Sequence, residues 1–337
     1  MYVNLYKSLP STILSLFFIV SCGGGGGGGG SSPLINTPSS PTYSYKTIQE
    51  RVNEGSISEF GDTGRTLSYI YHSESGSTWS TSRTDNLNIN FSQSVDSYGD
   101  DVVTISVNQV VNNIIPEGYT EALNYNLSYE ISYRPEYDTF PLYDAPNHVY
   151  LQKFFSNGDL LGFGLADTES FAGTSYVDMF IWYLDYDSGD RDFGAIAFGD
   201  KTKSGDMPSS GSATYNVKTM GFEHYDGYIY NFHGDGQLVS NFTNMTISGT
   251  FNNYYVTDQP FSWSQIVGAS AGSMSLTGDI SGINFSGSVD WDNGYGSGSF
   301  EGSFFGPNAK EIGGSFYAGK ENDAYRNNII GSFIGTK

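Results

Sequence analysis

The chain has 337 residues, of which 36 are Asp or Glu and only 15 are Lys or Arg, so its formal net charge at pH 7 is −21. Binding to nucleic-acid phosphates and adsorption to anionic lipid both need clustered Lys and Arg, so the charge argues against both kinds of partner. The chain also contains 43 Gly, 26 Tyr and 23 Phe. This composition favours strands and turns over long helices.

The first 21 residues predict an export signal. One cation, Lys7, precedes the apolar run 13–20, which is too short to span a bilayer as a permanent helix. Residues 19–22, Ile-Val-Ser-Cys, resemble a bacterial lipobox, although Ile19 stands where Leu is usual. Cys22 is the only cysteine, so it has no partner for an internal disulfide. We predict a lipoprotein signal peptide at 1–21 and lipid attachment at Cys22. An ordinary signal peptide with an incidental cysteine, or a weak membrane helix, is the alternative.

Residues 22–42 predict a disordered tether. Eight consecutive glycines, 23–30, are followed by Ser and Pro, and such a segment cannot bury enough apolar surface to fold. About twenty glycine-rich residues have an r.m.s. span of roughly 25 Å and stretch to about 65 Å. A tether of this length holds a folded body clear of lipid headgroups.

Residues 43–205 predict a β-rich domain with long loops. Residues 102–107 are β-branched, and 123–133 alternate strictly between apolar and polar side chains, which is typical of a half-buried strand. Residues 176–186 are more continuously apolar and predict a strand buried on both faces. No segment predicts a helix longer than two turns.

Residues 206–337 predict short antiparallel strands with one apolar face. Apolar residues and glycines alternate with Ser, Thr, Asn and Asp, for example over 273–280 and 283–291. Eight or nine such runs follow one another with short connections. An even number of strands with one aromatic face closes into a barrel, and glycines on that face leave room for the rings. An open sandwich needs the same alternation and remains the alternative.

The last part of the chain carries a family resemblance. Residues 304–316, Phe-Phe-Gly-Pro-Asn-Ala-Lys-Glu-Ile-Gly-Gly-Ser-Phe, resemble the C-terminal barrel signature of the transferrin-binding protein B-like family. Residues 331–335 are similar to that family's closing strand, and 206–215 to the segment that leads into its first barrel strand. In physical terms Gly306-Pro307 makes a turn, and we expect Glu311 to cap exposed backbone at that turn. These residues are interpreted as structural.

The resemblance implies a non-enzymatic lipoprotein, anchored in the outer membrane and facing the cell exterior, that captures an extracellular ligand through barrel and handle loops. Family members bind host iron proteins, haem carriers or complement regulators, often beside an outer-membrane transporter. Full transferrin receptors carry two handle-plus-barrel lobes, whereas this chain has length for one. The resemblance therefore favours a ligand other than transferrin, and it implies no bound cofactor. A structural or adhesive surface protein without nutrient capture is the alternative.

Two segments have catalytic or metal-binding spacing. Residues 268–272, Gly-Ala-Ser-Ala-Gly, fit the nucleophile elbow, but that motif needs a helix after the serine and a later histidine. A predicted strand follows instead, and the last histidine, His233, lies upstream, so Ser270 is predicted to lie in a hairpin turn. Residues 185–192 suggest a calcium loop, yet Gly189 stands where a ligand belongs. An acidic hairpin turn is the better interpretation.

Histidines and loop aromatics give weaker signals. The four histidines lie far apart in the chain without zinc-type spacing. One of them could ligate haem iron, but the sequence does not distinguish such a ligand from an ordinary surface or half-buried histidine, which is the favoured interpretation. The four are His72, His148, His224 and His233. Tyr254-Tyr255 and residues 261–263 flank a polar loop at 256–260. Such aromatics form binding hot spots or fill a barrel end, and packing is the favoured interpretation.

Overall fold

The computed structural model describes residues 43–48, 50, 56–72, 76–79, 83–95, 97–98, 101–114, 123–133, 140–141, 148–154, 160–166, 172–185, 191–225, 228–255, 270–292, 296–319 and 328–337. The predicted signal peptide, Cys22 and the tether lie outside these residues. Within them the chain is built from strands, with 3₁₀ turns at Ser204–Asp206 and Pro307–Ala309. None of the described helical segments has the length and apolar character needed to cross a membrane.

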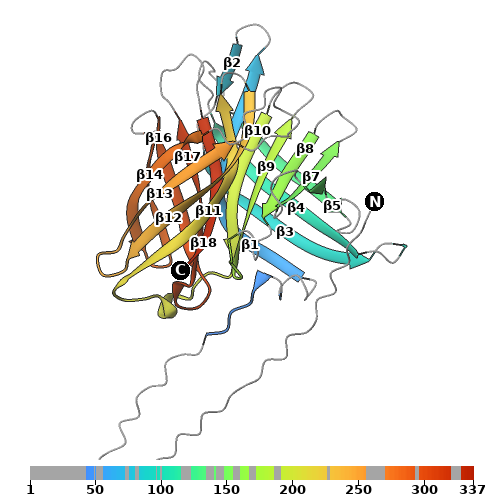
Figure 1. Ribbon diagram of the computed structural model, residues 1–337. Coiled ribbons are helices and arrows are strands. Elements are labelled where there is room, and N and C mark those ends of the chain that lie inside the picture. The colour runs from blue at the N-terminus through green and yellow to red at the C-terminus, as the bar shows by residue number, and fades with distance from the viewer. Residues whose placement is uncertain are drawn as a thin grey trace, which may run out of the picture. The chain divides into compact units, whose positions relative to one another are not determined.

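The N-terminal part forms one ten-stranded antiparallel sheet (Figure 1). Its strands are β1 (Ser56–His72), β2 (Gly76–Trp79), β3 (Arg83–Val95), β4 (Asp101–Ile114), β5 (Leu123–Tyr133), β6 (Phe140–Pro141), β7 (His148–Phe154), β8 (Leu160–Ala166), β9 (Val177–Asp185) and β10 (Arg191–Gly199). Their order is β5-β4-β3-β1-β10-β9-β8-β7-β6, with β2 paired to β1. The alternating segment 123–133 is strand β5, as predicted.

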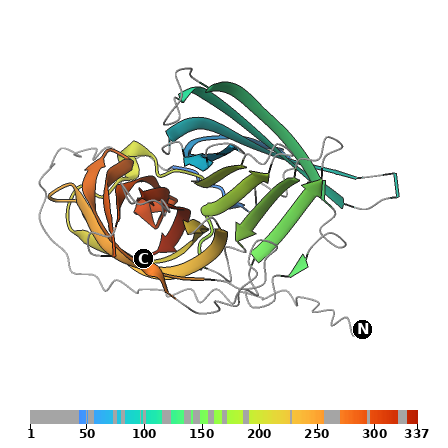
Figure 2. The same cartoon turned by 90° about the horizontal axis from the view of Figure 1, so that it is seen from above.

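The C-terminal part is a closed antiparallel barrel (Figure 2). Its eight strands are β11 (Ser212–Tyr225), β12 (Tyr228–Asn241), β13 (Thr246–Tyr255), β14 (Ser270–Ser281), β15 (Asn284–Trp291), β16 (Gly296–Phe305), β17 (Glu311–Gly319) and β18 (Asn328–Thr336). Each strand pairs with its neighbour in the chain, and β18 closes the ring by pairing with β11. The predicted barrel is confirmed and the sandwich alternative is wrong.

The barrel interior is packed with phenylalanine rings. Phe251 and Phe333 have ring centroids 5.2 Å apart, and Phe285 and Phe304 have centroids 5.3 Å apart. The first pair is tilted and the second is edge to face, and aromatic pairs of these kinds add about 0.5–1.5 kcal/mol each beyond their buried area. Gly331 makes this packing possible, since a Cβ there would lie 2.6 Å from the ring of Phe316. The glycines on the apolar face therefore leave room for rings, as the sequence predicts.

A second core joins the sheet to the outer face of the barrel. The sheet contributes Val177, Met179, Ile181, Phe193, Ala195 and Ala197, and the barrel contributes Met220, Phe222, Phe305, Ile330 and Ile334. Residues 177–179 and 181 of β9 are buried, which confirms for this part of the strand the prediction that both faces are covered. Sheet and barrel belong to one compact unit, Thr42–Lys337.

Candidate functional site

The two ends of the barrel differ in their connections. At one end, the short-loop end, β12–β13, β14–β15 and β16–β17 are joined across residues 242–245, 282–283 and 306–310. At the opposite end, the long-loop end, the connections include residues 256–269 and 320–327, which lie outside the described part of the chain. The predicted aromatic loop at 256–263 belongs to the long-loop end.

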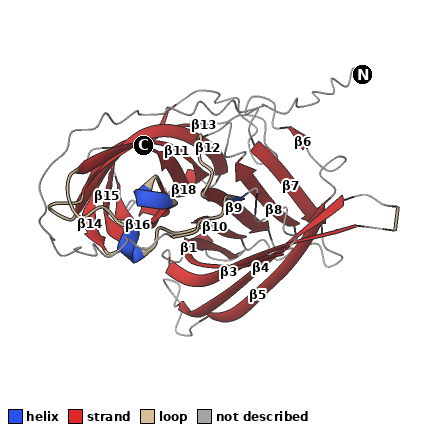
Figure 3. Ribbon diagram, turned by 90° about the horizontal axis from the view of Figure 1, so that it is seen from below, coloured by secondary structure: helices blue, strands red, loops and turns tan. Residues whose placement is uncertain are grey.

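The short-loop end is closed by the chain's own residues (Figure 3). The Tyr215 hydroxyl donates a hydrogen bond of 2.7 Å to the Ala309 carbonyl, and the Phe242 and Phe304 ring centroids are 5.5 Å apart. The Lys337 ammonium donates to the Asn308 carbonyl at 2.7 Å. Burial raises the pKa of the Tyr215 hydroxyl, so that group remains a hydrogen-bond donor. These residues close the short-loop end, and we call Tyr215, Phe242, Phe304 and the turn 306–310 the plug.

The first described residues lie against the same end. The Tyr45 hydroxyl donates to Asp206 Oδ2 at 2.8 Å and accepts from the Lys203 backbone N–H at 3.0 Å. The Lys46 N–H donates to Asp200 Oδ2 at 2.8 Å. No sequence pattern marks Tyr45 or its acidic partners, because these contacts join residues more than 150 positions apart. The folded body thus begins at the short-loop end.

Glu311 joins the sheet to the barrel. Its side chain is fully buried, and it accepts backbone N–H groups from Ser175 at 2.9 Å, Tyr176 at 2.7 Å and Val177 at 3.1 Å. Burial raises the pKa of this carboxyl, while the N–H donors and Lys310 act in the opposite direction. Glu311 caps backbone N–H groups, as predicted, but the prediction of which backbone it caps is wrong. The capped backbone leads into β9 of the sheet and is not that of the Gly306-Pro307 turn.

The barrel interior becomes partly polar on the side of the long-loop end. The Thr219 hydroxyl donates to Asn253 Oδ1 at 2.7 Å, and both residues are fully buried. Asn253 Nδ2 has no hydrogen-bond partner among the described residues. Gly234 faces this pair, since a Cβ there would lie 2.5–2.6 Å from both side-chain oxygens. Glu223, 3% exposed, lies further along β11 in the same direction.

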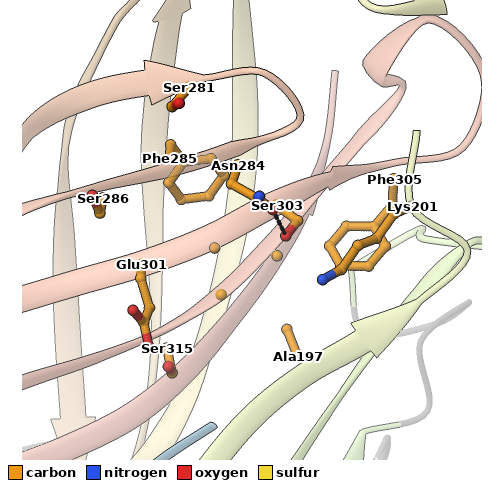
Figure 4. Close-up of a pocket in the computed structure, with 13 residues that line it drawn as sticks. Ala197, Lys201, Ser281, Asn284, Phe285, Ser286, Glu301, Ser303, Phe305 and Ser315 are labelled. Atoms are coloured by element: carbon orange, nitrogen blue, oxygen red, sulfur yellow. Dashed lines mark hydrogen bonds between the residues drawn. The ribbon is translucent and has the colours of Figure 1, made fainter. Parts of the chain in front are cut away.

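A polar hollow of about 340 Å³ lies on the outer face of β14–β17, beside the end of β10 (Figure 4). Ser303 and Ser315 contribute buried hydroxyls, and Ser303 donates to Asn284 Oδ1 at 2.8 Å. Lys201 and Glu301 stand on opposite sides of it. The hollow therefore lies at the junction of sheet and barrel, because Ala197 of β10 and Lys201 line it together with residues of β14–β17.

The candidate catalytic and calcium motifs do not assemble sites. Ser270 is exposed and is the first residue of strand β14, so the predicted hairpin turn at that residue is wrong, and the helix that a nucleophile elbow requires is replaced by a strand. Asp185 and Arg191 pair at the end of the β9–β10 hairpin, which confirms that the acidic segment connects two antiparallel strands. Residues 186–190 lie outside the described part.

The remaining candidates are dispersed. His233 is half-buried, and burial lowers its pKa despite the nearby Asp235. The other histidines lie on β1, β7 and β11, and the described residues contain no group of three metal-ligating side chains. Tyr254 is 39% exposed, so the favoured interpretation that it packs inside the barrel end is wrong. Residues 256–263 lie outside the described part.

Comparison with known proteins connects the barrel to a family. Residues 207–337 match the family model described as the C-lobe and N-lobe beta barrels of Tf-binding protein B. This match confirms the resemblance seen in the sequence for the barrel lobe. In a comparison with curated proteins, none matches.

Three solved structures are similar to this chain at low identity. A doubly substituted transferrin binding protein B from Haemophilus parasuis Hp5 has 10% identity and a TM-score of 0.40, over 81% of this chain and 66% of that one. A singly substituted form of that protein has 10% identity and a TM-score of 0.37, over 77% and 64%. Intact Ap-TbpB, with N and C lobes, has 11% identity and a TM-score of 0.37, over 81% and 64%. The chain thus spans just under two thirds of the length of these structures.

Proposed function

Because residues 207–337 form a transferrin-binding protein B-like barrel lobe, we propose that this protein is a lipid-anchored surface protein that binds an extracellular protein without catalysis. The ligand contacts the long-loop end of the barrel and the loops of the N-terminal sheet. The difference between the two barrel ends carries this proposal. One end is plugged by Tyr215, Phe242 and Phe304, whereas the other end bears the long connections 256–269 and 320–327.

The composition of the long connections suits a protein ligand. They contain Trp263, Tyr325 and Arg326, and Trp, Tyr and Arg are the residue types that dominate the energetics of protein–protein interfaces. Rigid strands below such loops limit the entropy lost when a partner binds. An iron- or haem-carrying host protein is the ligand class that we propose, with an outer-membrane transporter as a further partner.

The proposed anchor is consistent with this arrangement. Acylation of Cys22 would leave residues 23–42 as a tether that reaches the body at Tyr43, on the short-loop end. Lipid attachment through more than one acyl chain gives stable membrane binding, because each buried methylene contributes about 0.8 kcal/mol. The protein is then held at the outer membrane with its long-loop end available to the exterior.

The proposal is tested with the body, residues 43–337, in titration calorimetry against transferrin, haemoglobin and free haem. We expect one of the two proteins to bind with a heat of binding that free haem does not reproduce. A correctly folded body that binds none of them contradicts the proposal. Growth of a deletion strain under iron limitation separates nutrient capture, which predicts slower growth, from an adhesive role, which predicts unchanged growth and weaker cell attachment.

A further inference from the structure

Residues 43–48, which follow the proposed tether, are hydrogen-bonded to the folded body at the short-loop end. We call these residues the strap. Tyr45 bonds to Asp206 and to the Lys203 backbone, Lys46 bonds to Asp200, and the Ile48 N–H donates to the Ser175 carbonyl at 2.8 Å. Its contacts therefore reach both the end of the N-terminal sheet and the segment that leads into the barrel.

The groups that receive the strap are themselves held in place. Asp200, 5% exposed, accepts from the Lys203 ammonium at 2.9 Å through Oδ1, which leaves Oδ2 for the strap. Asp206 Oδ2 also accepts the Asn308 N–H of the β16–β17 turn at 3.0 Å. The same carboxylate oxygen thus links Tyr45 to the plug of the barrel.

Ring packing completes the strap. Tyr45 meets Tyr176 edge to face with centroids 6.2 Å apart, and the Lys203 ammonium lies 5.5 Å from the centre of the Tyr45 ring. The Tyr43 hydroxyl lies directly against Gly205. Both tyrosines of the strap therefore contact the folded body.

We propose that the strap is a positioning device, which fixes the point where the tether joins the body and so keeps the long-loop end turned away from the membrane. The inference rests on the proposed lipid attachment at Cys22. With the strap released, the tether would be lengthened by at least the residues of the strap, 43–48. A longer flexible chain joined to a different point of the body no longer selects one orientation.

The test uses the full acylated chain in supported bilayers that contain a quencher lipid. Dyes are attached through Asn244→Cys, at the short-loop end, or Ser297→Cys, near the long-loop end. Cys22 is the only native cysteine, and acylation blocks it, so the introduced thiol is the only reactive one. A fourteen-residue strand such as β11 with a tilt of about 40° separates the two ends by roughly 35 Å. We expect strong quenching at position 244 and little at position 297.

Tyr45→Ala is expected to remove the hydrogen-exchange protection of the Lys46 and Ile48 amides and to bring the quenching at the two positions close together. The matched control, Tyr98→Ala, changes a tyrosine in the turn between β3 and β4 that is 82% exposed, and it is expected to leave the contrast in quenching intact. An unchanged contrast after the strap amides lose protection would overturn the proposal. So would the absence of contrast in the wild type, or full amide protection in Tyr45→Ala.

Failure of the strap and failure of the proposed function are distinguishable. Ligand binding by the soluble body does not require the membrane, so Tyr45→Ala is expected to bind the calorimetric ligand as tightly as the wild type. If the body binds no ligand but the orientation of the acylated chain still depends on the strap, the ligand-capture role is refuted and the positioning role of the strap is supported. A chain that is not acylated but retains protected strap amides would refute the anchor and, with it, the positioning role.

Discussion

The short-loop and long-loop ends of the barrel are made by the same eight strands, yet they differ in how the interior is filled. At the short-loop end, Tyr215, Phe304 and the β16–β17 turn fill the space inside the barrel, and Asp206 links this turn to Tyr45 of the strap. Toward the long-loop end, the buried pair Thr219 and Asn253 makes the interior partly polar. Packing contacts are therefore concentrated at the short-loop end, and the proposed function assigns ligand recognition to the opposite end.

The largest expected effect belongs to the plug. Phe304 is fully buried and its ring contacts those of Tyr215, Phe242 and Phe285. Phe304→Ala is expected to lower the free energy of unfolding by about 3–5 kcal/mol, because the lost ring leaves a cavity. Urea denaturation of the body measures the change. A loss below about 1 kcal/mol, the level of an ordinary surface substitution, would show that the short-loop end does not carry stability.

The next largest effect concerns the junction of sheet and barrel. Glu311→Ala leaves three backbone N–H groups, one buried and two partly buried, without their acceptor and is expected to cost about 3 kcal/mol. Limited proteolysis should then cut near residues 172–177 before the barrel unfolds. Simultaneous loss of both regions would contradict a local role for the carboxylate.

The Glu311 carboxyl also predicts a pH dependence. Burial raises its pKa above the ordinary 4.5, so the stability it contributes is fully present below the unfolded pKa and falls as pH rises through the folded pKa. We expect the margin by which the wild type is more stable than Glu311→Gln to be largest below about pH 4.5 and to shrink toward neutral pH. Chemical denaturation across this range tests it, and the opposite slope would contradict the raised pKa.

A smaller effect separates hydrogen bonding from packing in the plug. Tyr215→Phe keeps the ring against Phe304 but removes the hydroxyl that donates to Ala309. We expect a loss of about 1 kcal/mol, measured by urea denaturation, and faster exchange of amides in residues 306–310. Stability equal to that of the wild type would mean that ring packing alone closes this end.

The smallest effect on stability is expected at the long-loop end. The triple variant Trp263→Ala, Tyr325→Ala and Arg326→Ala changes the loop residues proposed to bind ligand. Its unfolding free energy is expected to stay within about 0.5 kcal/mol of the wild type for each substitution. A thermal melt measures it, and a loss as large as that of Phe304→Ala would show that these loops belong to the core.

The barrel could be predicted from the sequence because its information is local. Period-two alternation over 273–280 and 283–291 places Met274, Leu276 and Phe285 inside, and the glycine positions follow from the space that facing rings need. The contacts that join the parts are not local. Glu311 caps backbone 134–136 residues upstream, and no period or spacing predicts that partner.

The candidate site was less predictable for a related reason. Phe251 and Asn253 face the barrel interior, so the period-two alternation of β13 places Tyr254 on the outer face, and the sequence prediction assigns it to the wrong side. Ser270 opens a strand because β14 begins earlier than its clear alternation does. The strap depends on Tyr45 meeting acidic residues that are distant in the chain, a consequence of the closed fold.

The most direct test of the account compares ligand binding by variants at the two barrel ends. The triple variant at positions 263, 325 and 326 is set against Thr243→Ala with Asn244→Ala, two exposed residues of the short-loop end, using immobilised transferrin or haemoglobin, whichever binds the wild type. The account predicts loss of binding in the triple variant and wild-type affinity in the control. Retention by the triple variant, or loss in the control alone, would contradict it.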